Sequence, residues 1–215
     1  MEKLLAFNKV STAIFTILTL FIVWLSPSVV LSADTEAEIV LRNGINSIID
    51  VLNDPAFADK SQKEVKRDIS LIKAEAFFDF KEFSRGALGQ NWRQFSSSQQ
   101  SEFTNYFSQL IANTYIAELD GESLNDIKIT YLKTEIIDAT KSGIERAEIS
   151  TEVFHNKIAT PVHYRMMKKK GESWKIYDVK IEGVSLVGNY REQYRTRFND
   201  PPDKFIQEIK EKIAQ

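Results

Sequence analysis

Residues 147–153, AEISTEV, and residues 162–166, VHYRM, decide the fold class of this 215-residue chain. In both stretches every second residue is polar, so that Ala147, Ile149 and Val153 fall on one face of an extended chain. Such alternation is typical of a strand that buries one face and exposes the other. The pattern predicts an antiparallel sheet in the second half of the chain.

The same alternation extends outward on both sides. Residues 127–131 show it, and the turn-like residues 168–173, KKKGES, lead into a fourth predicted strand at residues 174–181. In this last strand apolar side chains lie on one face up to Ile176 and on the other face from Tyr177 onward. We therefore expect either that both faces are covered or that a bulge interrupts the strand.

Apolar residues three and four positions apart predict two helices before the strands. The first covers residues 36–52 and ends before Pro55, because proline disfavours the helical conformation of the preceding residue. The second covers residues 61–78. Its predicted buried side carries Val65, Ile69, Ile72, Phe77 and Phe78.

Ser97 and Gln100 predict the start of a third, long helix, because their side chains can form a capping box. Two more helices are predicted at residues 184–198 and after Pro201. Helices followed by a strand meander predict an α+β domain, in which a helical half packs on a curved antiparallel sheet of about four strands. The third helix has the strongest periodicity, and its predicted inner face carries Phe103, Tyr106, Phe107, Leu110, Ile111, Thr114 and Tyr115.

The composition argues against several classes of function. Twenty-eight basic and 30 acidic residues give a net charge of −2, whereas nucleic-acid binders normally have a basic excess. The absence of cysteine excludes disulfides, thiol nucleophiles and cysteine-bound zinc. His155 and His163 are too few for most histidine-built metal sites. We predict no nucleic-acid partner, no metal and no cofactor.

The first 33 residues have the pattern of a secretory signal peptide. A positively charged start precedes the apolar residues 10–25, and the helix-breaking Pro27 and residues 28–33, SVVLSA, follow. We expect cleavage after Ala33. Residues 34–215 would then form a single domain. An uncleaved membrane anchor is the alternative, because Leu31 stands where a smaller residue is the better cleavage signal.

Catalytic motifs are absent or incomplete. Residues 183–187, GVSLV, resemble a nucleophile elbow except that Val187 replaces the final glycine. Tyr164, Tyr177 and Asp178 could form an acid/base group in a cavity, as in some isomerases and dehydratases. The simpler interpretation makes the tyrosines wall residues and turns Asp178 toward other polar groups. We therefore predict no catalytic residue and keep a cavity-containing α+β enzyme as the alternative.

Phenylalanine is unusually frequent in the part after residue 33. The chain has fourteen phenylalanines, and three of them, Phe7, Phe15 and Phe21, belong to the first 33 residues. The remaining aromatic residues either fill a core or line a cavity for an apolar ligand. Composition does not choose between the two.

Several motifs occur in the order and spacing of a known family. They are residues 78–93 (FDFKEFSRGALGQNWR), Gln99-Gln100, Phe103, residues 174–179 (WKIYDV), residues 181–187 (IEGVSLV) and residues 189–191 (NYR). Together they closely resemble the MlaC or toluene-tolerance family, periplasmic phospholipid-binding proteins of Gram-negative bacteria. The resemblance covers most of the chain after residue 33. Family members often carry a larger residue where Gly86 stands.

This resemblance implies a periplasmic carrier, not an enzyme, that buries the acyl chains of a phospholipid in an apolar pocket between helices and sheet and leaves the headgroup exposed. Such a carrier shuttles phospholipid between an outer-membrane lipoprotein complex and an inner-membrane ABC transporter, in a system that maintains outer-membrane lipid asymmetry. A related branch is associated with hopanoids, which leaves a second lipid class open. The predicted pocket residues are Phe78, Phe83, Trp92, Phe103, Tyr106, Phe107, Ile111, Tyr115, Tyr164, Trp174, Ile176, Val184 and Leu186.

Overall fold

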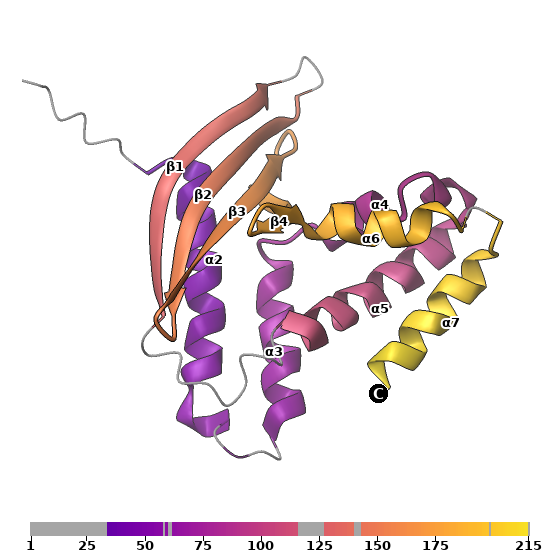
Figure 1. Ribbon diagram of the computed structural model, residues 1–215, viewed down its shortest axis with the longest axis horizontal. Helices are drawn as coiled ribbons and strands as arrows, with labels where there is room; N and C mark the ends of the chain where they lie inside the picture. Colours follow the sequence, from indigo (N-terminus) through magenta and orange to yellow (C-terminus); the bar gives the residue numbers. More distant parts are fainter. Residues whose placement is uncertain are drawn as a thin grey trace, which may run out of the picture. The chain divides into compact units, whose positions relative to one another are not determined.

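The computed structural model describes residues 34–57, 59, 62–115, 127–139, 143–197 and 199–214 (Figure 1), and these residues belong to one compact unit, Asp34–Gln215. The helices and strands described are α2 (Glu36–Asn53), α3 (Lys63–Glu75), α4 (Phe80–Leu88), α5 (Ser97–Tyr115), β1 (Lys128–Ala139), β2 (Glu145–His155), β3 (Ile158–Lys168), β4 (Lys175–Ile181), β5 (Val184–Ser185), α6 (Leu186–Arg195) and α7 (Pro202–Ile213). Short 3-10 segments occupy Pro55–Phe57 and Gly89–Gln94. The predicted α+β class is confirmed.

The strands form one antiparallel sheet in the order β1-β2-β3-β4-β5, so each strand pairs with its neighbour in the sequence. Between β2 and β3, Ile149 lies opposite Tyr164 and Thr151 lies opposite Val162. Figure 1 shows the curved strands β1 to β3 beside α2. The four predicted strands are present, and the two-residue β5 adds a fifth that the alternation did not reveal.

A bulge in β4 explains its mixed pattern. Asp178 pairs with Arg165, but the next pair joins Ile176 to Met166, so Tyr177 is an extra residue on its strand. An extra residue reverses the alternation, and apolar side chains can then lie on the same face before and after it. Of the two interpretations that the sequence left open, the bulge is the one found.

The second predicted helix is present as α3, but it buries a different side. Val65 and Ile72, expected inside, are 44% and 67% exposed, and Ile69 is half-buried, so the prediction is wrong for this stripe. It is right for Phe77, which is buried, and Phe78 is half-buried against both apolar clusters. α3 packs beside α2, where a Cβ on Gly44 would lie 2.4 Å from Cγ of Phe77. A helix buries the side that fits its neighbour, which apolar periodicity alone does not reveal. The buried residues of α3 are Lys66, Ser70 and Ala74.

The capping box of α5 lies one residue earlier than predicted. The N–H of Gln99 donates to Ser96 Oγ over 3.3 Å, and the N–H of Ser96 donates to Gln99 Oε1 over 3.0 Å. Gln100, predicted as the second member, instead donates through Nε2 to the backbone carbonyl of Trp92. Ser96 with Gln99 and Ser97 with Gln100 both have the spacing of a capping box, so the sequence alone does not show which pair forms it.

Helix α4 was not predicted, and its start is well defined. The Asp79 carboxylate accepts the N–H of Glu82 at 2.9 Å and binds Lys169 Nζ at 2.8 Å. Burial raises the pKa of Asp79, but Lys169 and the Glu82 N–H together outweigh it, so the pKa lies below its usual value. α4 packs on α6, where a Cβ on Gly86 would lie 2.7 Å from Val187 Cγ1. A larger residue at this position therefore requires a shift of Val187.

Candidate functional site

Four helices enclose the first of two apolar clusters, which we call the helical cluster. Its aromatic rings touch at many points: the centroid of Phe107 lies 5.2 Å from that of Phe103, 6.0 Å from that of Phe83 and 4.9 Å from that of Tyr190. The first of these contacts is stacked, the second tilted and the third edge-on, and stacked and edge-on arrangements are favourable for aromatic pairs. The buried members are Phe83, Ala87, Leu88, Trp92, Phe95, Phe103, Phe107, Leu110, Ile111, Val187, Tyr194, Phe205, Ile206 and Ile209.

A second cluster, the sheet cluster, lies between α2, the end of α3 and the sheet. Phe78 and Leu186 are half-buried and pack against both clusters. The ring of Phe78 lies 5.8 Å from that of Phe77 on one side and 6.2 Å from that of Phe83 on the other. The two clusters therefore meet at Phe78 and Leu186. The buried members of the sheet cluster are Ala37, Leu41, Ala74, Phe77, Ala147, Ile149, Val162, Met166, Trp174, Ile176 and Val179.

The predicted pocket residues are divided between these clusters. Phe83, Trp92, Phe103, Phe107 and Ile111 are buried in the helical cluster, and Tyr106 and Tyr115 pack against it. Trp174 and Ile176 are buried in the sheet cluster, and Tyr164 packs against it. Phe78 and Leu186 pack against both clusters, whereas Val184 is 59% exposed and belongs to neither.

The prediction left out one part of the helical cluster. Phe205, Ile206 and Ile209 of α7 are buried there, and Tyr194 of α6 packs beside them with its ring 5.5 Å from that of Phe205. The apolar spacing in the last helix is the sequence signal for these residues. The spacing indicated a buried face but did not say which cluster that face joins.

Asp178 joins the sheet to the start of α6. Its carboxylate accepts the Ser185 hydroxyl at 2.7 Å and the Val187 N–H at 3.1 Å, and it binds Arg165 Nη1 at 3.3 Å. Ser185 itself caps α6 by accepting the N–H of Gly188 at 2.8 Å. A carboxylate at the start of a helix is also favoured by the helix dipole. Asp178, 2% exposed, therefore has a structural role in these contacts.

The tyrosines suggested as its acid/base partners lie elsewhere. Tyr164 pairs with Val179, the neighbour of Asp178, so Tyr164 and Asp178 point to opposite faces of the sheet. Burial raises the pKa of Tyr164 above its usual value. Tyr177 is the bulge residue. The structure does not bring these groups together as an acid/base site.

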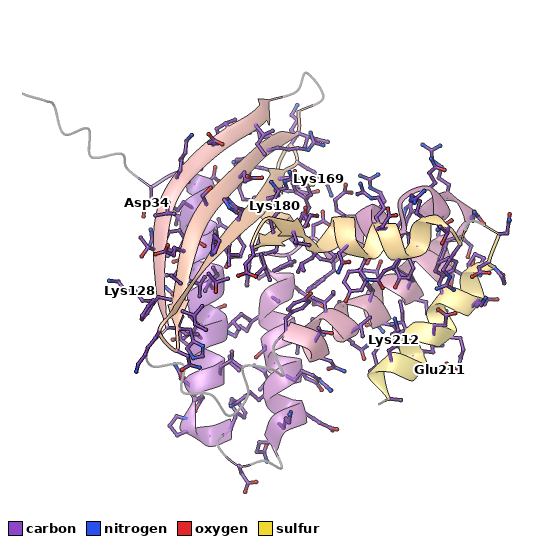
Figure 2. All side chains as sticks on the ribbon, viewed as in Figure 1. Asp34, Lys128, Lys169, Lys180, Glu211 and Lys212 are labelled. Carbon is purple, nitrogen blue, oxygen red and sulfur yellow. The ribbon has the colours of Figure 1, made fainter. Side chains whose placement is uncertain are left out.

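The outer face of the sheet carries a network of charges around Glu148. Its carboxylate accepts Lys180 Nζ at 2.7 Å and Arg165 Nε at 3.0 Å, and Figure 2 labels Lys180 on the sheet. Burial raises the pKa of Glu148, but the hydrogen bonds from Lys180 and Arg165 outweigh it, so the pKa lies below its usual value. His163 lies beside this network, with Nδ1 2.9 Å from Ser150 Oγ. The ionised form of Glu148 is the one that these contacts stabilise.

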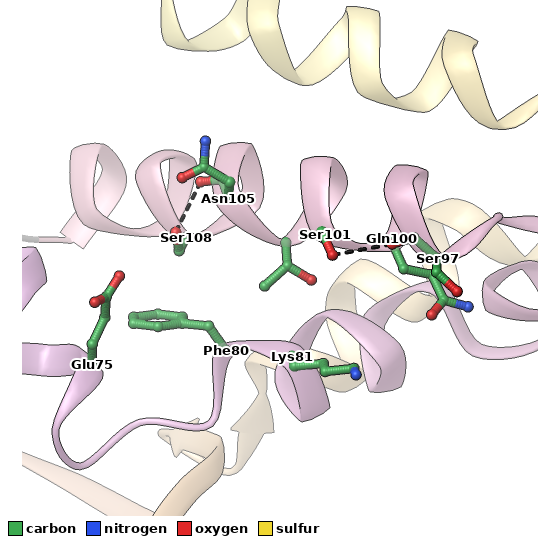
Figure 3. Close-up of a pocket in the computed structure, with 9 residues that line it drawn as sticks. Glu75, Phe80, Lys81, Ser97, Gln100, Ser101, Asn105 and Ser108 are labelled. Atoms are coloured by element: carbon green, nitrogen blue, oxygen red, sulfur yellow. Dashed lines mark hydrogen bonds between the residues drawn. The ribbon is translucent and has the colours of Figure 1, made fainter.

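A polar cleft of about 360 Å³ lies between the end of α3, the start of α4 and one side of α5 (Figure 3). None of the predicted pocket residues lines it. The sequence signal for it is a stripe of small polar residues along α5, on another side from its aromatic face. The lining residues are Glu75, Phe80, Lys81, Ser97, Gln100, Ser101, Thr104, Asn105 and Ser108.

Two further features follow from the described part of the chain. Among those residues, no three His, Asp or Glu side chains are grouped so that they could hold a metal ion. In the same residues, no helix combines the length and the apolar character needed to cross a membrane.

Comparisons with known proteins identify a family and related solved structures. The family described as MlaC protein matches residues 42–211. The solved structure of a phospholipid-binding protein from Ralstonia solanacearum, in complex with a phospholipid, has a TM-score of 0.67 and 20% sequence identity to this chain. The alignment covers 84% of this chain and 98% of that one. A search of curated proteins gives no match.

Proposed function

Because the chain belongs to the MlaC family, we propose that it binds phospholipid and carries it through the periplasm. The observation that supports this most is the fold shared with the Ralstonia protein, which was solved with a bound phospholipid. The division of the interior into two apolar clusters also favours a carrier. Asp178, the strongest candidate for a catalytic acid, is already held by Arg165, Ser185 and Val187.

We place the acyl chains at the junction of the helical and sheet clusters. Phe78 and Leu186 contact both clusters. An acyl chain inserted beside them would separate the two clusters, and the apolar side chains would contact lipid in place of one another. Two chains of about fifteen methylenes each represent roughly 24 kcal/mol of transfer from water, at about 0.8 kcal/mol per methylene. A bilayer offers a similar free energy, so transfer between membrane and protein is close to neutral.

A near-neutral exchange needs partners that give it a direction. We propose an inner-membrane ABC lipid transporter on one side and an outer-membrane lipoprotein complex on the other, as the family resemblance implies. Residues 1–33 would serve as a cleaved signal peptide that directs the chain to the periplasm. Glycerophospholipid is the proposed cargo, and hopanoid-type lipid is the alternative.

Native mass spectrometry of the full chain, produced in a Gram-negative host and released from the periplasm, tests both proposals. The expected species begins at Asp34 and carries the added mass of a phospholipid, confirmed by organic extraction. Protein that begins at Asp34 but repeatedly yields no lipid would overturn the carrier proposal. Chains recovered only from membranes and still beginning at Met1 would overturn the proposed cleavage.

A further inference from the structure

Strand β1 is the long edge of the sheet. It has twelve residues and, among the residues that the structure describes, it pairs only with β2. The opposite edge strand, β5, has two residues and continues directly into α6. An open edge strand carries unpaired N–H and C=O groups that can pair with a further strand. In the described sheet, β1 is therefore the edge to which another strand can be added (Figure 1).

The exposed side chains of β1 are unusually apolar for an edge strand. Leu132, Ile136 and Ile137 are 61%, 58% and 52% exposed. Scattered exposed apolar side chains are common, but several within one short stretch mark an interaction surface. Edge strands that stay unpaired are usually very short, covered, or protected by charged side chains. The apolar side chains of β1 therefore favour a partner at this edge.

Two bulges limit the stretch of β1 that can pair regularly. The pairing of β1 with β2 shifts at Leu132 and again at Ile137, and residues 133–136 pair without interruption with residues 147–150. Because a bulge disrupts the ladder, a strand added to β1 would match it mainly over these residues and their nearest neighbours. A contact of this length buries little surface, so it is weak and reversible.

The charges in this stretch match a second copy of the same strand. Lys133 and Glu135 form an ion pair on β1, and their side chains are 66% and 54% exposed. Two identical antiparallel strands in one sheet are related by a two-fold axis that passes between the two copies of one residue. With Thr134 on this axis, Lys133 of each copy lies opposite Glu135 of the other. The exposed Leu132 then lies opposite Ile136 of the other copy. With Lys133 or Glu135 on the axis, two like charges would face each other, which is unfavourable.

We infer that two copies of this chain associate through antiparallel β1 strands with Thr134 on the two-fold axis, so that their sheets become one continuous sheet. The Thr134 hydroxyl donates to Glu38 of α2 at 3.0 Å, so this side chain points to the α2 side of the sheet. Its neighbours Lys133 and Glu135 point to the opposite side, where the four charges of the two copies alternate in sign. Neither charged residue belongs to the helical or the sheet cluster, so the inference does not rest on the proposed lipid binding.

Charge reversal followed by analytical ultracentrifugation tests this register. The chain, recovered from the periplasm of a Gram-negative host, is expected to dimerise reversibly as its concentration rises. Lys133→Glu and Glu135→Lys should each weaken the dimer about tenfold or more, because each turns two opposite-charge pairs into like-charge pairs. An equimolar mixture of the two variants should dimerise again, since every charged pair across the axis then has opposite signs. Glu211→Lys and Lys212→Glu, on an exposed part of α7, are the matched controls.

Thr134→Cys provides a geometric readout, because the chain has no cysteine of its own. Directly opposite residues of antiparallel strands have Cα atoms about 4.5–5.5 Å apart, a distance that a disulfide can span. Mild oxidation should therefore link two Thr134→Cys chains. Thr130→Cys is the control, because in this register the two copies of residue 130 would lie about 26 Å apart along the ladder, at about 3.3 Å per residue.

A chain that stays monomeric at every concentration up to about 1 mM would overturn the inference. A dimer that both charge reversals leave unchanged, or that the mixture fails to restore, would overturn it as well, because β1 would not be paired in this register. Equal cross-linking of Thr130→Cys and Thr134→Cys would have the same meaning. Lipid content of the same samples tests the carrier separately: a dimer that repeatedly yields no lipid counts against the carrier alone, and a lipid-loaded monomer counts against the dimer alone.

Discussion

Phe107→Ala is expected to lower the free energy of unfolding by about 3–5 kcal/mol, as replacement of a buried phenylalanine by alanine typically does. Phe107 is 1% exposed, and three aromatic rings of the helical cluster surround it. Its removal costs the transfer free energy of the ring and leaves a cavity that the neighbouring rings fill incompletely. Urea-induced unfolding, followed by circular dichroism, measures the change.

The control for Phe107 is Phe154→Ala, because Phe154 is 43% exposed at the end of β2. We expect this change to cost less than about 1 kcal/mol, as at most surface positions. Equal losses for the two variants would contradict the packing described for the helical cluster. A loss below about 1 kcal/mol for Phe107→Ala would do so as well.

Asp178→Ala is expected to cost about 2–4 kcal/mol, because it removes the acceptor for three donors at once. The Val187 N–H is buried, and the Ser185 hydroxyl would lose the contact that positions it at the start of α6. Arg165 would lose less, since its side chain is 35% exposed and keeps its contact with Glu148. Thermal and urea unfolding together measure the effect.

Asp68→Ala is the matched control for Asp178, because among the described residues Asp68 pairs only with the adjacent Arg67, on an exposed part of α3. Its cost should stay within about 0.5 kcal/mol. Asp178→Asn should lie between the two, because an amide oxygen still accepts a hydrogen bond but no longer attracts Arg165. If Asp178→Ala and Asp68→Ala lose the same free energy of unfolding, the contacts of Asp178 between the sheet and α6 do not stabilise the fold.

The sequence predicted the strands better than the helices, for a physical reason. A strand alternates with a period of two, so the polarity of Glu148, Ser150 and Glu152 already determined which face of β2 is buried. A helix can bury any side that matches its neighbour. On α3 the buried side carries Lys66, Ser70 and Ala74, whereas the apolar Val65 and Ile72 are exposed.

The candidate site was less predictable than the fold. Trp92 and Trp174 have the same character in sequence and are both buried, but they belong to different clusters. The assignment depends on how α4 and β4 are placed by contacts distant in sequence. The polar cleft depends on which side of α5 faces Phe80 and Lys81, and no local pattern contains that information.

The central claim is that phospholipid chains lie where the two clusters meet, and fluorescence can test it directly. With the proposed cleavage at Ala33, the chain would retain two of its three tryptophans, Trp92 in the helical cluster and Trp174 in the sheet cluster. Trp174→Phe and Trp92→Phe variants then report on one cluster each. Phospholipids with bromine atoms along their acyl chains quench tryptophan on contact, whereas unlabelled phospholipids do not.

The measurement is therefore the quenching of each single-tryptophan variant by brominated phospholipid, with bound lipid quantified in the same samples. The account predicts that both Trp92 and Trp174 are quenched as lipid binds. Bound lipid that quenches neither tryptophan would contradict it, because the chains would then lie outside both clusters.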